Sequence, residues 1–175
     1  FRNKKSLITG ASTGLGAELA KAFAQQGAIV GLHYFSSEDA AKTVASEIQG
    51  EGGRIELIKA DVSDSQAMAG AVREAAEVLG GLNGLINNAG GMVRRVPYAK
   101  VSDKDYDEIM DLNARSIVVA SREALPFLKE QGGFVINTTS IAARNGAGGG
   151  AGMYGSSKAF VSNVTRGMAT VSYTH

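Results

Sequence analysis

The sequence predicts an α/β fold with a doubly wound, parallel β-sheet. Short, continuously apolar runs alternate with helical patterns, and this alternation recurs along all 175 residues. Strands separated by helices of a dozen or more residues pair in parallel, because a parallel crossover needs a connection of that length. Such crossovers are right-handed and place helices on both faces of the sheet. No linker or change of composition interrupts the pattern, so we expect one domain over residues 1–175.

The first strand, helix and second strand occupy the amino-terminal fifth of the chain. Leu7 and Ile8 form a buried strand. Residues 15–26 repeat their apolar positions with the 3.6-residue period of a helix, which Gly27 ends. The next apolar run, residues 28–34, predicts the second strand.

The second helix and third strand follow. Ser36 with Asp39 three residues later is typical of a capping box, and Gly50 marks the end of the helix that it opens. Residues 54–62 predict the third strand.

A second capping-box pattern, Ser63 with Gln66, opens a helix to about Leu79. Residues 82–90 then predict a fourth strand that runs into a polar turn.

The last predicted elements are a long helix, a strand and a final helix. Ser102 with Asp105 opens a single helix that we expect to reach about Lys129. Residues 132–140 predict the fifth strand, and a final helix begins near Met153.

The composition excludes several classes of function. A net charge of +1 creates no field for nucleic acid or an anionic membrane surface. The chain has no cysteine, so it has neither disulfides nor thiolate metal sites, and its two histidines argue against a metal centre. No apolar run is long enough to span a bilayer, and no signal peptide opens the sequence. We expect a cytoplasmic protein.

A glycine-rich turn, TGASTGLG at residues 9–16, lies between the first strand and the first helix. Gly10, Gly14 and Gly16 allow a close backbone approach to a diphosphate, and the helix start offers free N–H groups. Ser12 and Thr13 add hydroxyl donors. The turn therefore predicts a dinucleotide site; the structural alternative is a tight turn that only needs glycine backbone angles.

The end of the second strand bears on the choice of cofactor. An acidic residue here binds the adenosine ribose in many NAD sites. This sequence instead reads Tyr34-Phe35-Ser36, and its first carboxylates, Glu38 and Asp39, come later. A 2′-phosphate meets no carboxylate at this position, so we expect NADP, with NAD as the alternative.

Five motifs follow one another along the chain: the glycine turn, NNAG at 87–90, Asn113, Ser140, and YGSSK at 154–158. In this order they resemble the short-chain dehydrogenase/reductase family, and within it the 3-oxoacyl-[acyl-carrier-protein] reductase and sugar dehydrogenase branches. The resemblance implies a Rossmann-type NAD(P)-binding sheet and a hydride transfer between nicotinamide and a small carbonyl compound or secondary alcohol.

The resemblance also implies four catalytic residues. Tyr154 would pass a proton to or from the substrate oxygen, and Lys158, one helical turn away, would favour its phenolate and hold the nicotinamide ribose. Ser140 would donate to the substrate oxygen. Asn113 would fix a water in a proton relay to Lys158. As structural alternatives, Asn113 would cap a helix kink and Ser140 would be an ordinary strand-end hydroxyl.

Further residues are implied to contact the cofactor. Asp61 and Val62 resemble the pair that flanks the adenine, although Asp61 alternatively bonds the following turn. Asn88, Ala89 and Gly90 would face the ribose. The full predicted set is Gly10, Ser12, Thr13, Gly14, Leu15, Gly16, Tyr34, Ser36, Asp61, Val62, Asn88, Ala89, Gly90, Tyr154 and Lys158. His33 is interpreted as a satisfied strand residue, and Arg94-Arg95 as a solvated loop at the rim of the site.

The carboxyl-terminal end departs from the family pattern. The resemblance implies two more strands and a substrate-covering lid, so we expect five of seven strands, a fifth strand at the sheet edge and a C-terminally incomplete domain. The glycine-rich stretch between Ser140 and Tyr154 is interpreted as a substrate loop. Self-association into a dimer or tetramer is expected. The alternative function is a catalytically inactive nucleotide-binding or interaction module.

Overall fold

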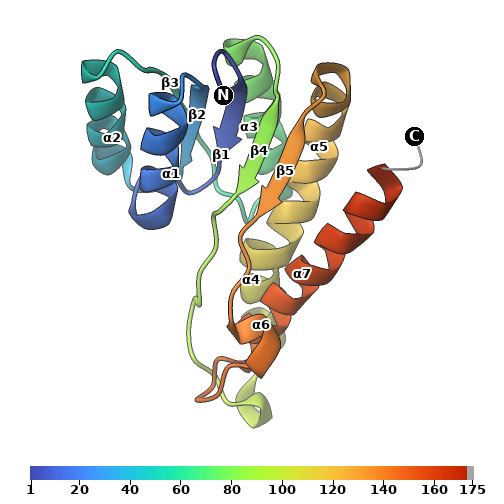
Figure 1. Ribbon diagram of the computed structural model, residues 1–175. Helices are drawn as coiled ribbons and strands as arrows, with labels where there is room; N and C mark the ends of the chain where they lie inside the picture. Colours follow the sequence, from blue (N-terminus) through green and yellow to red (C-terminus); the bar gives the residue numbers. More distant parts are fainter. Residues whose placement is uncertain (173–175) are drawn as a thin grey trace.

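The computed structural model describes residues 1–172 and confirms the predicted parallel sheet. The strands lie in the order β3-β2-β1-β4-β5, and every neighbouring pair is parallel (Figure 1). Their bounds are β1 Lys5–Ile8, β2 Ile29–Tyr34, β3 Arg54–Lys59, β4 Gly84–Asn87 and β5 Phe134–Asn137.

Helices cover both faces of the sheet, as the crossovers predict. The apolar residues of α1 and α2 form one buried cluster on the sheet, and those of α3 and α5 form a second cluster on the opposite face (Figure 1). The bounds are α1 Gly14–Gln25, α2 Glu38–Gly50, α3 Ser65–Leu79, η1 Tyr98–Lys100, α4 Asp103–Met110, η2 Asp111–Arg115, α5 Ser116–Gln131, α6 Ala142–Asn145 and α7 Gly152–Ser172.

Two of the three predicted capping boxes are wrong. Helix α2 begins at Glu38 after Ser37, whose side chain makes no cap hydrogen bond. Helix α3 is capped by Asp64, because the Ser63 hydroxyl donates to Asp61 instead (2.6 Å). The Ser102–Asp105 box at the start of α4 is confirmed, with both reciprocal bonds present.

The predicted long helix from residue 103 to 129 is interrupted. A π-helical turn, η2, separates α4 from α5 and contains Asn113. A π-turn adds one residue to a helical turn, and the spacing of apolar residues does not reveal such an insertion. The predicted helix was therefore continuous. Strands β3, β4 and β5 each end three residues earlier than predicted, at Lys59, Asn87 and Asn137.

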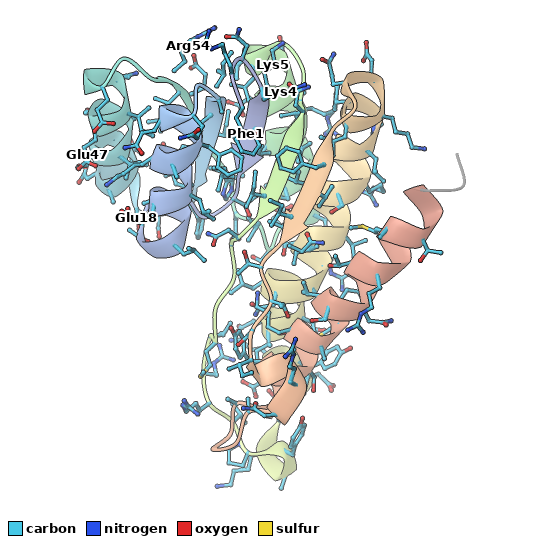
Figure 2. All side chains as sticks on the ribbon, viewed as in Figure 1. Phe1, Lys4, Lys5, Glu18, Glu47 and Arg54 are labelled. Atoms are coloured by element: carbon cyan, nitrogen blue, oxygen red, sulfur yellow. The ribbon has the colours of Figure 1, made fainter. Side chains whose placement is uncertain are left out.

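Strand β5 lies at one edge of the sheet, as expected. All six residues of β2 are buried, whereas none in β5 is, and Ile136 is 47% exposed. Figure 2 shows Lys4, Lys5 and Arg54 gathered at the amino ends of the strands. The opposite, carboxyl ends of the strands carry the candidate site.

Candidate active site

The glycine turn follows β1 and leads into α1. Gly10 and Gly14 both have left-handed backbone angles, with φ of +62° and +55°. A Cβ on Gly16 would lie 2.2 Å from the Gly10 carbonyl oxygen, so only glycine fits there. No atom lies within 4 Å of the place where a Gly14 Cβ would stand. Gly10 and Gly16 therefore shape the turn, and Gly14 leaves open space at the start of α1.

A cavity of about 410 Å³ lies against this turn. Its size falls within the usual range of small-molecule sites. Twelve of the predicted cofactor residues line it: Gly10, Ser12, Thr13, Leu15, Gly16, Tyr34, Ser36, Asp61, Val62, Asn88, Ala89 and Gly90. The cavity lining also includes four residues that the sequence did not single out for it: His33, Phe35, Ser37 and Leu112.

The predicted Asn88 turn is bonded directly to the glycine turn. The Thr9 hydroxyl accepts the backbone N–H groups of Asn88 and Ala89, both at 3.0 Å. The Asn88 amide donates to the carbonyls of Thr9 (3.0 Å) and Gly10 (3.1 Å). Both amide N–H bonds of Asn88 are thus used within the protein. Thr9, a polar residue ending an apolar strand, was the signal that the sequence offered for this link.

Asp61 lies in the cavity lining and also holds its own turn. Its carboxylate accepts the Ser63 backbone N–H (2.9 Å) and hydroxyl (2.6 Å). The structural interpretation of Asp61 is therefore confirmed, and it coexists with a position in the cavity wall.

Asn113 is completely buried in the π-turn and forms hydrogen bonds with the segment that follows the NNAG motif. Its Oδ1 accepts the Gly91 N–H (3.0 Å), and its Nδ2 donates to the carbonyls of Gly91 (2.8 Å) and Ile109 (3.0 Å). The structure thus shows Asn113 both within a helix irregularity and tied to the predicted ribose turn.

Lys158 is buried beside the same turn. Its side-chain amine donates to the Thr138 carbonyl (3.1 Å), and it lies 6.0 Å from the centre of the Tyr154 ring. A Cβ on Gly90 would lie 3.0 Å from this amine and 2.7 Å from Asn113 Oδ1. Burial lowers the pKa of the Lys158 ammonium. The structure therefore brings Tyr154, Lys158, Asn113 and Gly90 together.

Ser140 follows β5 in the loop before α6. Its hydroxyl accepts the Ala142 N–H at 3.2 Å, which leaves the hydroxyl hydrogen available as a donor. The half-buried Ser140 lies two residues beyond Thr138, the partner of Lys158. The loop geometry thus places a hydroxyl at the same end of the sheet as Tyr154.

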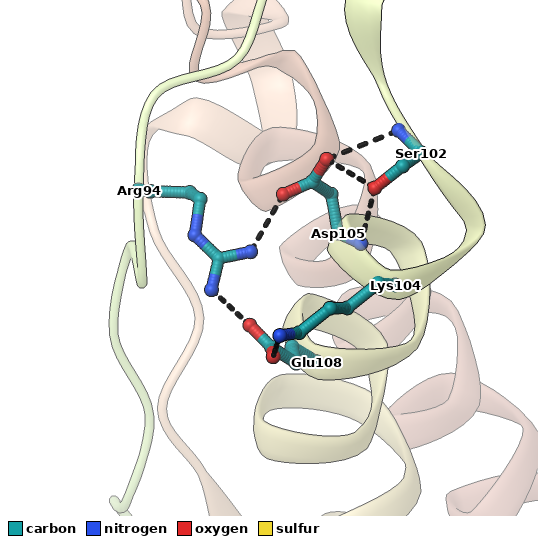
Figure 3. A network of polar contacts seen from close by, with 5 residues as sticks. All are labelled: Arg94, Ser102, Lys104, Asp105 and Glu108. Atoms are coloured by element: carbon teal, nitrogen blue, oxygen red, sulfur yellow. Dashed lines mark hydrogen bonds and ion pairs between the residues drawn. The ribbon is translucent and has the colours of Figure 1, made fainter.

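The segment after Gly91 is fixed to α4 by Arg94, which was expected to be solvated. Its guanidinium pairs with Asp105 (2.6 Å) and with Glu108, and Asp105 also closes the Ser102 capping box (Figure 3). Hydrogen bonds from Ser102, with help from Arg94, lower the pKa of Asp105 to about 2. Arg94 therefore ties the segment that follows Gly91 to helix α4.

The glycine-rich loop packs tightly against residues 95–98. The Val96 N–H donates to the Gly150 carbonyl at 2.8 Å, and Arg95 donates to the Gly149 carbonyl at 3.1 Å. A Cβ on Gly152 would lie 2.5 Å from the Tyr98 ring. Gly150 and Gly152 are thus needed for close packing of this segment on residues 95–98, where two segments approach each other below β4 and β5 (Figure 1).

Residues 1–172 contain neither a cluster of metal ligands nor a membrane-spanning helix. No group of three or more histidine or acidic side chains in this part of the chain could hold a metal ion. None of the described helices is long and apolar enough to cross a membrane.

Comparisons with known proteins give the family. The family model for short chain dehydrogenases matches residues 4–175. A 3-oxoacyl-[acyl-carrier-protein] reductase of Staphylococcus aureus is 30% identical over 95% of this chain and 67% of its own. Curated relatives are matched over only 56% to 67% of their length.

Solved structures agree. The NADH-dependent reductase A1-R′, complexed with NAD, has a TM-score of 0.92 at 35% identity, covering 97% of this chain and 73% of that one. A short chain dehydrogenase of Burkholderia cenocepacia, in complex with NADP, has a TM-score of 0.91 at 37% identity, covering 97% and 68%. The chain therefore belongs to the short-chain dehydrogenase family of oxidoreductases.

Proposed function

We propose that this chain forms the cofactor-binding and proton-transferring part of an NADP(H)-dependent oxidoreductase that acts on a small carbonyl compound or secondary alcohol. One observation carries the proposal. The buried Lys158 ammonium lies 6.0 Å from the Tyr154 ring and next to Gly90, which lines the cavity. The phenol and the cation thus lie beside Gly90 at one end of the sheet, although Tyr154 and Lys158 are not themselves among the residues that line the cavity.

Tyr154 is proposed as the general acid and base. A buried positive charge favours the phenolate over the phenol, so Lys158 would assist Tyr154 in giving up its proton to the substrate oxygen and regaining it. Ser140 would donate its free hydroxyl hydrogen to the same oxygen, where negative charge develops. Bound NADP(H) supplies or accepts the hydride. Asn113 would hold the Gly91 segment and, through a water, connect Lys158 to solvent.

The cavity lining fits a dinucleotide. The open space at Gly14 and the N–H groups of the first turn of α1, which have no partner within the helix, suit a diphosphate. Asp61 and Val62 would flank the adenine, and Tyr34 and Ser36 would lie by its ribose. Gly10, Ser12, Thr13, Leu15, Gly16, Asn88 and Ala89 complete the proposed contacts.

A cluster of charged side chains that the sequence interpretation did not include lies beside the cavity wall. Glu38 accepts from Lys42 (2.8 Å) and Lys59 (3.0 Å), and these bonds lower the pKa of its carboxyl to about 2. The Lys59 amine also lies 5.9 Å from the Tyr34 ring in the cavity wall. Glu38 and Asp39 balance the charges of Lys42 and Lys59, so we propose only that Lys59, beside the cavity wall, offers its ammonium to a 2′-phosphate.

Turnover and binding measured separately test the proposal. Absorbance of NADPH should fall when the protein is mixed with small ketones, and Lys158→Met should slow this by at least ~100-fold, the usual contribution of acid–base assistance. Lys129→Met, an exposed change on α5, is the matched control. Retained NADPH binding without turnover of any ketone would favour the inactive module. A lower Kd for NADH than for NADPH would refute the cofactor choice.

We also propose that the protein self-associates in the cytoplasm as a dimer or tetramer. Tyr106 on α4 is 50% exposed and Val118 on α5 is 39% exposed, so these two helices offer apolar side chains that a second copy could cover. Light scattering should give at least twice the monomer mass, and Val118→Lys should reduce it. A monomer at all concentrations would refute this part.

A further inference from the structure

A single buried imidazole connects two walls of the cavity. His33, in β2, is 1% exposed. Its Nδ1 accepts the backbone N–H of Gly10 at 3.2 Å, and its own carbonyl accepts the next N–H, of Ala11, at 2.8 Å. The first bend of the glycine turn is therefore attached to β2 by both the side chain and the main chain of one residue.

The other ring nitrogen holds the second wall. His33 Nε2 lies 3.1 Å from the Ala60 carbonyl, at the point where the chain leaves β3. Ala60 is followed directly by Asp61 and Val62, which line the cavity. One side chain thus joins the turn proposed for the diphosphate to the turn proposed for the adenine.

The two bonds require one form of the ring. A backbone N–H can only donate, so Nδ1 must carry a lone pair; a carbonyl can only accept, so Nε2 must carry the hydrogen. Only the neutral Nε2–H tautomer satisfies both partners. A protonated ring would direct a second hydrogen at the Gly10 N–H and break the contact.

Sheet pairing does not depend on this side chain. The backbone of β2 pairs in register with β3 at every position, including His33 opposite Ile58, and with β1 from Ile29 to Leu32. Any apolar residue of similar size could fill the space, so the two directed bonds indicate a role beyond packing. Their partners are the two backbone segments that form the cavity.

We propose that His33 is a positioning residue for the cofactor: through Gly10 and Ala60 it holds the glycine turn and the Asp61 turn at the spacing that a bound dinucleotide needs. This inference rests on the proposed function, because it requires that a nicotinamide dinucleotide occupies the cavity. No direct contact between His33 and the cofactor is needed.

Two conservative variants separate the two bonds. In His33→Asn, the amide oxygen occupies the place of Nδ1 and can still accept from Gly10. In His33→Gln, the amide nitrogen occupies the place of Nε2 and can still donate to Ala60, but the Gly10 N–H is left unpaired. We expect the Kd for NADPH, measured by fluorescence titration, to rise about tenfold in each variant, because the loss of either bond breaks the connection between the two turns.

The thermal midpoints of both variants provide the control for packing. A purely structural role predicts that NADPH affinity follows stability, whichever bond is kept. Parent-like NADPH binding by either variant, or a loss of affinity that only follows the loss of thermal stability, would overturn the inference. A parent protein that binds neither NADPH nor NADH would refute the proposed function and the inference with it, whereas failure of the variant pattern refutes the inference alone.

A measurement on the unmodified protein covers the case in which the variants do not fold. Nitrogen-15 spectra of the parent should show His33 as the Nε2–H tautomer at neutral pH, before and after addition of NADP⁺. The Nδ1–H tautomer would contradict the inference, since that form cannot accept from Gly10.

Discussion

Strands β2 and β5 are parallel members of the same sheet, yet the chain covers them to different degrees. All of β2 is buried between α2 and α3, and it leads into the cavity through His33 and Tyr34. Strand β5 lies at the sheet edge with Ile136 47% exposed, and it leads to Ser140 and the glycine-rich loop. The proposed cofactor side is thus enclosed and cross-bonded, and the proposed substrate side is more open.

The difference indicates which side of the site has its backbone turns held most firmly. On the cofactor side, Thr9, His33 and Asn88 fix backbone turns through paired bonds of 3.0 to 3.2 Å. On the other side, loops support one another through backbone carbonyls and the Arg94 cluster (Figure 3). We therefore expect changes near the glycine turn to cost more than changes near β5.

The largest effect is expected at Gly16. A Cβ there would lie 2.2 Å from a backbone oxygen, so Gly16→Ala should lower the free energy of unfolding by about 4 kcal/mol and abolish NADPH binding. Gly70→Ala, in helix α3, is the control: nothing lies within 4 Å of its Cβ position, and it should stabilise by up to about 1 kcal/mol. Urea unfolding measures both, and equal effects would contradict the close packing.

Stability should also depend on pH through His33. Burial lowers the pKa of this ring to about 4 from 6.5, so the unfolded chain takes up a proton first as the pH falls. The contribution of neutral His33 to the free energy of unfolding is fully present above pH 6.5. It is lost as the pH falls towards about 4, and the total loss is about 3 kcal/mol. His33→Asn should remove this part of the slope in urea titrations, whereas carboxylates common to both proteins cancel. Identical slopes would refute the prediction.

A matched pair of isoleucines sharpens the comparison of enclosed and edge strands. Ile86 in β4 and Ile136 in β5 are opposite each other in register, but Ile86 is 1% exposed. Ile86→Ala should cost about 3 kcal/mol, and Ile136→Ala less than about 1 kcal/mol. Similar losses in chemical denaturation would mean that β5 is covered in solution.

The smallest effect is expected at Arg94. Its side chain is 39% exposed and its ion pairs with Asp105 and Glu108 are screened by water. Arg94→Met should therefore lower the free energy of unfolding by less than about 1 kcal/mol, and less still at high salt. A salt-independent loss of several kcal/mol would show that the pair acts as a buried one.

The sequence allowed the fold and the positions of the motifs to be predicted, because apolar periodicity and glycine turns are local signals. The proximity of Tyr154 and Lys158 was predictable because residues four apart lie one turn apart on a helix. The bonds that shape the site were not predictable in the same way. Thr9 reaches Asn88, His33 reaches Gly10, and Asn113 reaches Gly91 across more than twenty residues of chain, and the π-turn that turns Asn113 inward leaves no periodic trace.

Replacing the phenol of Tyr154 tests the central claim most directly. Tyr154→Phe keeps the ring beside Lys158 and removes the transferable proton. It should lower kcat/KM for ketone reduction by at least ~100-fold while the Kd for NADPH changes less than about threefold. Lys129→Met, an exposed change on α5, should leave both unchanged. Ketone reduction by Tyr154→Phe at the parent rate would contradict the account.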